Sequence, residues 1–151
     1  MARTRINSKS KDLIEDNGSV LLSVIKGEQI QIEITLGWLT NLTGYTLLAK
    51  IIEADSSTLD HTDPTSLPTI QKSGGVVTTL PIIDTTVSDN TFNIVIPETL
   101  VNSYTTQPLP LKPSYGWIGL EVADAGVGNA RQVWKPMRGL VEILYSPTEV
   151  S

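Results

Sequence analysis

The sequence predicts an all-β domain, a β-sandwich of about seven or eight strands with an extended N-terminal arm. Short stretches in which apolar and polar residues alternate recur along the chain, and this period of two is that of a strand with one buried face. Glycine, proline and asparagine separate these stretches at close spacing, and no stretch carries a helical period over several turns. This pattern is typical of a sandwich, with a small barrel as the alternative.

The 151 residues fit one domain, which charge divides into two segments. Four cations, Arg3, Arg5, Lys9 and Lys11, precede the first acidic residue, Asp12. Without them, residues 12–151 have seven cations against sixteen acids, a formal charge of −9. We therefore expect residues 1–18 to form an extended basic arm and residues 19–151 to form the sandwich.

The arm is polar, so burial repays little of the entropy that ordering it costs. The adjacent pair Leu13 and Ile14 is the exception. One interpretation is a frayed terminus. The other is an arm that becomes ordered against a neighbouring subunit, with the cations on an acidic surface and the apolar pair buried.

The first half of the body predicts three strands. Residues 19–25 are rich in β-branched and other apolar residues, and the turn Lys26-Gly27-Glu28 suggests a hairpin with the next strand, 30–36. Residues 37–44 form a loop or bend, with Trp38 packed under it. The third strand runs from Tyr45 to about Glu53.

The middle of the chain combines a long loop with two strands. Residues 55–75 are polar and contain two prolines. Residues 76–83 read as a strand, in which Pro81 indicates a sheet edge or the end of pairing. After a turn, residues 91–96 alternate cleanly, and Pro97 can open one helical turn.

The last third predicts a connector and a closing hairpin. Residues 104–114 contain three prolines and are expected to be extended. A strand at 115–123 is followed by a hairpin loop at 124–129. Residues 130–134 are expected to form the returning strand of this hairpin, and Lys135-Pro136 to interrupt it. The last strand is expected at residues 138 to 145.

The alternation also predicts which residues are buried. Gln31 should lie on the solvent-exposed face of its strand. Residues Trp117, Gly119 and Glu121 should face away from the core. The expected core residues are Ile30, Ile32, Ile34, Leu47, Ala49, Ile51, Phe92, Ile94, Ile96, Ile118, Leu120, Val122, Val141 and Ile143.

The residues suggest no catalytic centre, metal site or cofactor. The only histidine, His61, stands between Asp60 and Asp63 on the long loop, and residues so close in sequence seldom converge on one ion. The carboxylates of Glu33, Glu121 and Glu142 fall on expected solvent-facing positions, where nothing predicts the opposed pair of a glycosidase. We therefore expect a protein that is not an enzyme.

Composition also bears on partners and location. An acidic body argues against a nucleic-acid surface, because such binding needs cations that replace counterions. No apolar run approaches the roughly 20 residues of a membrane span, so we expect no membrane contact. The chain has no cysteine, which fits synthesis in a cytoplasm.

Three pieces of the sequence, in this order and spacing, resemble a known family. They are the turn Lys26-Gly27-Glu28 before an alternating strand, the step Leu42-Thr43-Gly44-Tyr45 into the next strand, and a closing part. The closing part has the Tyr-containing strand 115–122, the Gly-led strand 139–143 and then Pro147-Thr148-Glu149. From about Lys26 to Thr148, the chain is similar to the immunoglobulin-like domains of tailed-phage virion proteins. These include the N-terminal domain of baseplate upper proteins and related short tail and head accessory proteins.

The resemblance implies an immunoglobulin-like sandwich that is synthesised in the host cytoplasm and has a structural role in a virion. The expected partners are capsid, neck or tail subunits and other copies of the chain, as a tail, neck or baseplate adaptor or a capsid decoration. The alternative is a carbohydrate-binding adhesion module that uses exposed tryptophans such as Trp38, Trp117 or Trp134. The candidate partner contacts are Arg3, Arg5, Lys9, Lys11, Leu13, Ile14, Trp38 and Trp117.

Overall fold

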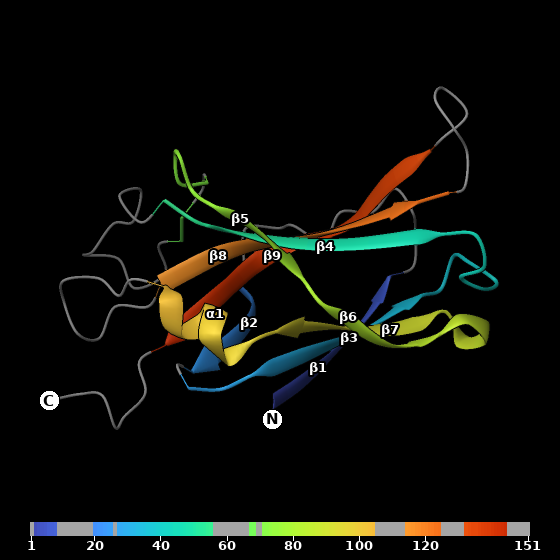
Figure 1. Ribbon diagram of the computed structural model, residues 1–151, viewed down its shortest axis with the longest axis horizontal. Coiled ribbons are helices and arrows are strands. Elements are labelled where there is room, and N and C mark those ends of the chain that lie inside the picture. The colour runs from blue at the N-terminus through green and yellow to red at the C-terminus, as the bar shows by residue number, and fades with distance from the viewer. Residues whose placement is uncertain are drawn as a thin grey trace, which may run out of the picture.

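The computed structural model describes residues 2–8, 20–25, 27–55, 67–68, 71–104, 114–124 and 132–144. Within these residues the chain is nearly all β, with nine strands and one short α-helix, which confirms the predicted class (Figure 1). The elements are β1 (Ala2–Ser8), β2 (Val20–Ile25), β3 (Ile30–Leu36), β4 (Thr46–Glu53), β5 (Val77–Leu80), β6 (Ile82–Thr86), β7 (Thr91–Ile96), α1 (Glu98–Ser103), β8 (Ser114–Ala123) and β9 (Val133–Leu144).

The strands form two sheets that pack face to face. Sheet A has the order β1-β3-β7-β6, and sheet B has the order β2-β9-β8-β4-β5. The antiparallel neighbours β3-β7-β6 match strands B, E and D of an immunoglobulin sandwich, and β9-β8-β4-β5 match strands G, F, C and C′. The topology is therefore immunoglobulin-like. Parallel strands β1 and β2 complete the two sheets beside β3 and β9.

The expected hairpin between residues 19–25 and 30–36 is wrong. β2 pairs in parallel with β9 in sheet B, whereas β3 belongs to sheet A. The turn at Gly27, which has a positive φ of 93°, carries the chain from one sheet to the other. Local turn residues identify the change of direction, but the pairing partner of β2 is the last strand of the fold.

The prolines of the second half act in two different ways. At Pro81 the expected strand 76–83 divides, so that β5 pairs with β4 in sheet B and β6 pairs with β7 in sheet A. At Pro136 the expected interruption does not occur, because β9 is continuous from Val133 to Leu144. The register with β8 shifts between Leu120 and Val122, and this bulge accommodates a proline inside the pairing.

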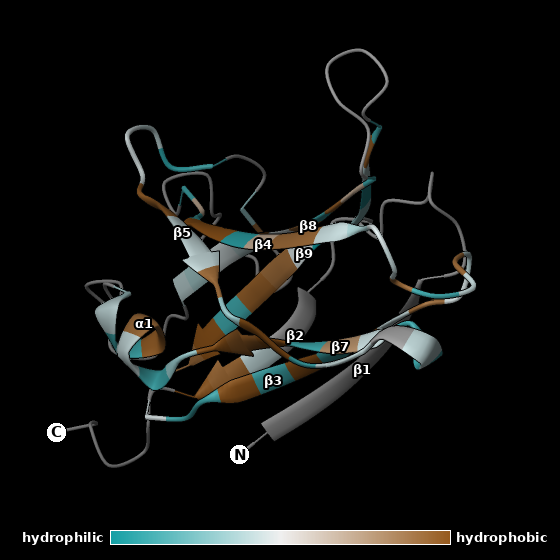
Figure 2. Ribbon diagram, turned by 45° about the vertical axis from the view of Figure 1, so that its right-hand side comes forward, coloured by the Kyte–Doolittle hydropathy of each residue, from teal (hydrophilic) through white to brown (hydrophobic). Residues whose placement is uncertain are grey.

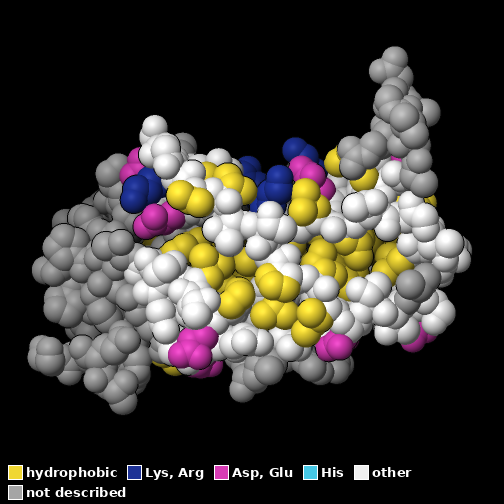
Figure 3. Space-filling view, in the orientation of Figure 1, with side chains coloured by type: hydrophobic (Ala, Val, Ile, Leu, Met, Phe, Trp, Pro, Cys, Tyr) yellow, Lys and Arg dark blue, Asp and Glu magenta, His cyan; other side chains and the backbone are white. Residues whose placement is uncertain are grey.

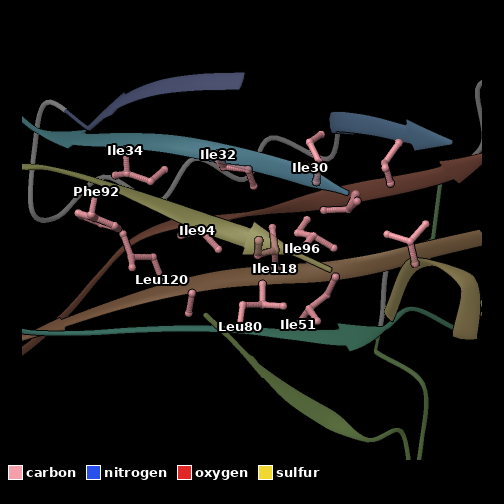
Figure 4. Close-up of a cluster of buried hydrophobic side chains, with 14 of the residues drawn as sticks. Ile30, Ile32, Ile34, Ile51, Leu80, Phe92, Ile94, Ile96, Ile118 and Leu120 are labelled. Carbon is pink, nitrogen blue, oxygen red and sulfur yellow. The ribbon is translucent and has the colours of Figure 1, made fainter. Parts of the chain in front are cut away.

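Both sheets contribute to one core. Side chains of β3 and β7 point toward those of β4, β5 and β8 (Figure 4), and in Figure 2 the hydrophobic stretches follow the strands of both layers. All fourteen expected core residues except Leu47 are buried, and Leu47 is half-buried against the same cluster. Leu36, Leu42, Leu80, Val101 and Tyr104 complete the cluster together with Val24.

The outer faces of the sheets are less exposed than the alternation predicts. Gln31 is only 6% exposed, and the Asn93 amide nitrogen lies 3.5 Å from its side-chain oxygen. On sheet B, Tyr115, Trp117 and Leu140 are buried in a second cluster, against which Leu67 of the long loop packs. The expectation that Gln31 is exposed to solvent is therefore wrong, whereas Trp117 does face away from the main core.

Candidate interaction surface

The first part of the predicted arm lies along sheet A of its own chain. All seven residues of β1 pair in parallel with β3, which places Arg3 beside Gln31 and Arg5 beside Glu33 in the register. These residues extend sheet A at its edge, so this part of the arm is a strand of the sandwich. The other arm contacts, Lys9, Lys11, Leu13 and Ile14, lie outside the described residues, as does His61.

Trp38 packs at one end of the sandwich. Its ring lies edge-to-face on Trp134 of β9, with 5.7 Å between ring centroids, and Tyr45 lies 6.2 Å from the same indole. All three side chains are half-buried and pack against the main core. The side-chain amide of Asn90 donates a hydrogen bond to the carbonyl oxygen of Leu39, which ties the loop around Trp38 to the turn before β7. The geometry gives Trp38 a packing role.

Trp117 lies on the outer face of sheet B but is covered. Its side chain is 6% exposed and contacts Tyr115 and Leu140 in the second cluster. The Arg138 guanidinium lies 4.6 Å from the ring centroid, a cation–π distance. A sugar-binding platform needs an open ring face. The covered Trp117 does not offer one, which argues against its use in the carbohydrate-binding alternative.

A carboxylate on β9 holds three strands of sheet B together. Glu142 accepts hydrogen bonds from the Ser23 hydroxyl of β2 at 2.9 Å and the Tyr115 hydroxyl of β8 at 3.2 Å. Burial and the adjacent Glu142 raise the pKa of Tyr115 to about 12. Burial, with a smaller contribution from the charge of Glu53, also raises the pKa of the Tyr104 hydroxyl. Both tyrosines are therefore neutral hydrogen-bonding or packing groups rather than acid–base groups.

An apolar strip follows the edge where the chain passes from sheet B to sheet A. Val76 is 79% exposed, Val77 is 54% exposed and Ile83 is 37% exposed. β5 and β6 are the last strands of their sheets in the described part of the chain, so a row of backbone groups there faces no further strand. Figure 3 shows apolar side chains gathered across the middle of this side of the molecule. We call these three residues the β5–β6 strip.

The β5–β6 strip was absent from the contacts predicted from sequence. Its signal is Pro81, which indicates a sheet edge, together with the apolar pair Val76-Val77 that precedes it. Alternation alone assigns one of any two adjacent valines to the interior, so the exposure of both was not evident.

A metal centre and a membrane-spanning helix each set requirements with which the described residues can be compared. Among them, no three His, Cys, Asp or Glu side chains gather so that they could hold a metal ion. No helix in the same part of the chain is long and apolar enough to cross a membrane. What the described surface offers is an exposed apolar edge, which is suited to contact with another protein.

Comparison with known proteins finds distant similarity among solved structures. No family model matches the chain, and a search of curated proteins finds no match. Among solved structures, the N-terminal domain of phage TP901-1 ORF48 is similar at 6% sequence identity, covering 95% of this chain and 99% of that chain. The TM-score is 0.44. A likeness this distant does not assign the chain to a family.

Proposed function

We propose that this protein is a non-enzymatic structural component of a tailed-phage virion. It joins neighbouring subunits of the tail, neck or baseplate as an adaptor, or decorates the capsid. The observation that carries the proposal is the β5–β6 strip, where apolar side chains and an open strand edge occupy one surface. Such a surface invites association unless a partner covers it.

The residues that resemble the phage family support the proposal through their place in the fold. Gly27 and Gly44 both have positive φ, 93° and 80°, at the turns that lead into β3 and β4. The second turn is closed by a hydrogen bond of 3.1 Å from the Tyr45 amide to the Leu42 carbonyl oxygen. Gly27, Gly44 and the Leu42–Tyr45 turn therefore build the sandwich itself, and contact with partners falls to the surface around them.

The proposed partners are other virion proteins and further copies of this chain. The acidic body makes nucleic acid an unfavourable partner, since phosphates would meet a formal charge of −9 over residues 12–151.

The test is co-sedimentation with particles that lack the protein. The double variant Val76→Lys/Ile83→Lys places charges on the strip, and Ser73→Lys/Thr85→Lys places the same charges at nearby exposed positions. We expect the first variant to lose most of its binding while its melting temperature stays close to that of the wild type. The control should bind normally. Equal binding by both variants, or no binding of the wild-type protein to any particle, would refute the proposal.

A further inference from the structure

A hollow of about 380 Å³ lies on the outer face of sheet B, beside the covered Trp117. Its floor is a row of three residues across three strands, because Gly119 of β8 is paired with Lys50 of β4 on one side and with Arg138 of β9 on the other. Glycine carries no side chain, so the row consists of two cations with a gap between them. Neighbouring strands are about 5 Å apart, which separates the two cationic strands by about 10 Å.

The hollow is positively charged on an acidic molecule. Lys135 and Glu121 form one wall, with 3.8 Å between the Lys135 Nζ and a Glu121 carboxylate oxygen. Three cations thus surround the hollow with one carboxylate, whereas residues 12–151 as a whole carry a formal charge of −9. In Figure 3, Lys and Arg side chains gather along the upper margin, on the side of sheet B. Lys50 is exposed and belongs to neither the Lys135–Glu121 nor the Lys72–Glu53 ion pair.

We propose that this hollow binds an acidic, extended peptide segment of another virion subunit, with a carboxylate seated over Gly119 between Lys50 and Arg138. The proposal rests on the proposed function and names the chemistry of one partner. The charge of the hollow selects an anion, and the gap over Gly119 admits one acidic side chain. The covered ring of Trp117 favours a peptide over an anionic sugar, because this ring offers no open face for stacking.

The apolar surroundings fit a peptide as well. Leu48 lines one part of the hollow, and an adjoining depression is lined by Ile52 and Val77. Val77 also belongs to the β5–β6 strip, so the hollow and the strip form one continuous surface. A segment that places a carboxylate over Gly119 can lay an apolar neighbour against Val77.

The test is a titration of the ¹⁵N-labelled full chain with hexaglutamate, followed by amide chemical shifts. We expect the largest shifts at Lys50, Gly119 and Arg138. The double variant Lys50→Gln/Arg138→Gln, which changes two exposed residues, should bind about twofold to thirtyfold more weakly, since each exposed ion pair contributes about 0.2–1 kcal/mol. Gly119→Val, which keeps the cations but fills the gap, should weaken binding similarly. Lys72→Gln, which removes a cation paired with Glu53 outside the hollow, should bind as the wild type does.

Three outcomes would overturn the proposal. The first is equal binding by the double variant and by Lys72→Gln, and the second is unchanged binding by Gly119→Val. The third is tighter binding of an oligogalacturonate of equal charge than of hexaglutamate, which would point to a sugar. Melting curves establish that each variant is folded. If the double variant does not fold, the test is repeated with the single variant Lys50→Gln. If Lys50→Gln/Arg138→Gln loses hexaglutamate binding but is incorporated into particles normally, the hollow does not bind a virion subunit. The proposed structural role in the virion would be unaffected by that result.

Discussion

At the scale of single residues, the outer face of sheet A shows where alternation is a sound guide and where it is not. Alternation placed Ile32 inside and Gln31 outside, and Ile32 is fully buried. Gln31 faces away from the core, yet it is also buried, and Asn93 beside it lies 3.5 Å from both Gln31 and Asp84 side-chain oxygens. A period of two identifies the face of a strand, but coverage of the outer face depends on segments distant in sequence.

A carboxylate at position 31 and one at position 32 should therefore both lower stability, but by different amounts. Ile32→Asp puts an unpaired charge in the main core, which costs several kcal/mol and should prevent folding. Gln31→Asp puts a carboxylate near Asp84 and Asn93 and should lower the unfolding free energy by about 1–2 kcal/mol. Urea unfolding monitored by tryptophan fluorescence measures both. An unchanged urea midpoint for Gln31→Asp would show that its side chain is hydrated in solution.

The two buried tyrosines predict how stability depends on pH. The pKa of Tyr115 is raised to about 12 and that of Tyr104 is raised as well, whereas an unfolded chain ionises its tyrosines near pH 10. Above that pH the unfolded state loses protons first, so the unfolding free energy should be level below about pH 10 and fall as the pH rises toward 12. Urea midpoints at successive alkaline pH values test this. Tyr104→Phe should show a shallower fall, and an identical slope would contradict the assignment.

At the scale of elements, the strands with clean alternation were found at nearly their observed bounds, as β3 and β7 illustrate. The sequence did not predict which of the two sheets each strand belongs to. The residues of β2 are typical of a strand. They do not indicate that its partner is β9, which lies more than a hundred positions later in the sequence. Long-range pairing is decided by the packing of the whole sandwich, because a local turn such as the one at Gly27 serves a hairpin and a change of sheet equally well.

The N-terminal strand offers a direct test at this scale. Removing residues 1–8 deletes β1 and leaves the edge of β3 without its parallel neighbour. The core residues of the two sheets remain, so we expect the truncated protein to fold, with a lower urea midpoint and a tendency to self-associate through the open edge. Sedimentation velocity and urea unfolding measure these effects. A truncated protein that stays monomeric with an unchanged midpoint would show that β1 contributes nothing to sheet A.

At the scale of the whole molecule, length and patterning were sufficient to predict one all-β sandwich, but not the surface that we propose as functional. Val77, Lys50, Gly119 and Arg138 are far apart in sequence and meet only because sheet B has the order β9-β8-β4-β5. All four belong to strands that were predicted from the sequence. Their adjacency follows from the sheet order, which no single segment encodes.

This adjacency predicts two separable contributions to attachment. If the hollow and the β5–β6 strip bind one partner, raising the salt concentration should weaken attachment of the wild-type protein to particles, because exposed ion pairs are screened. Lys50→Gln/Arg138→Gln should bind more weakly at low salt and depend less on salt than the wild type, since the remaining cation of the hollow, Lys135, is already paired with Glu121. Val76→Lys/Ile83→Lys keeps the hollow, so it should bind more weakly than the wild type at every salt concentration and still depend on salt. Co-sedimentation over a salt series measures all three proteins, and a wild-type affinity that does not depend on salt would show that attachment uses the strip without the hollow.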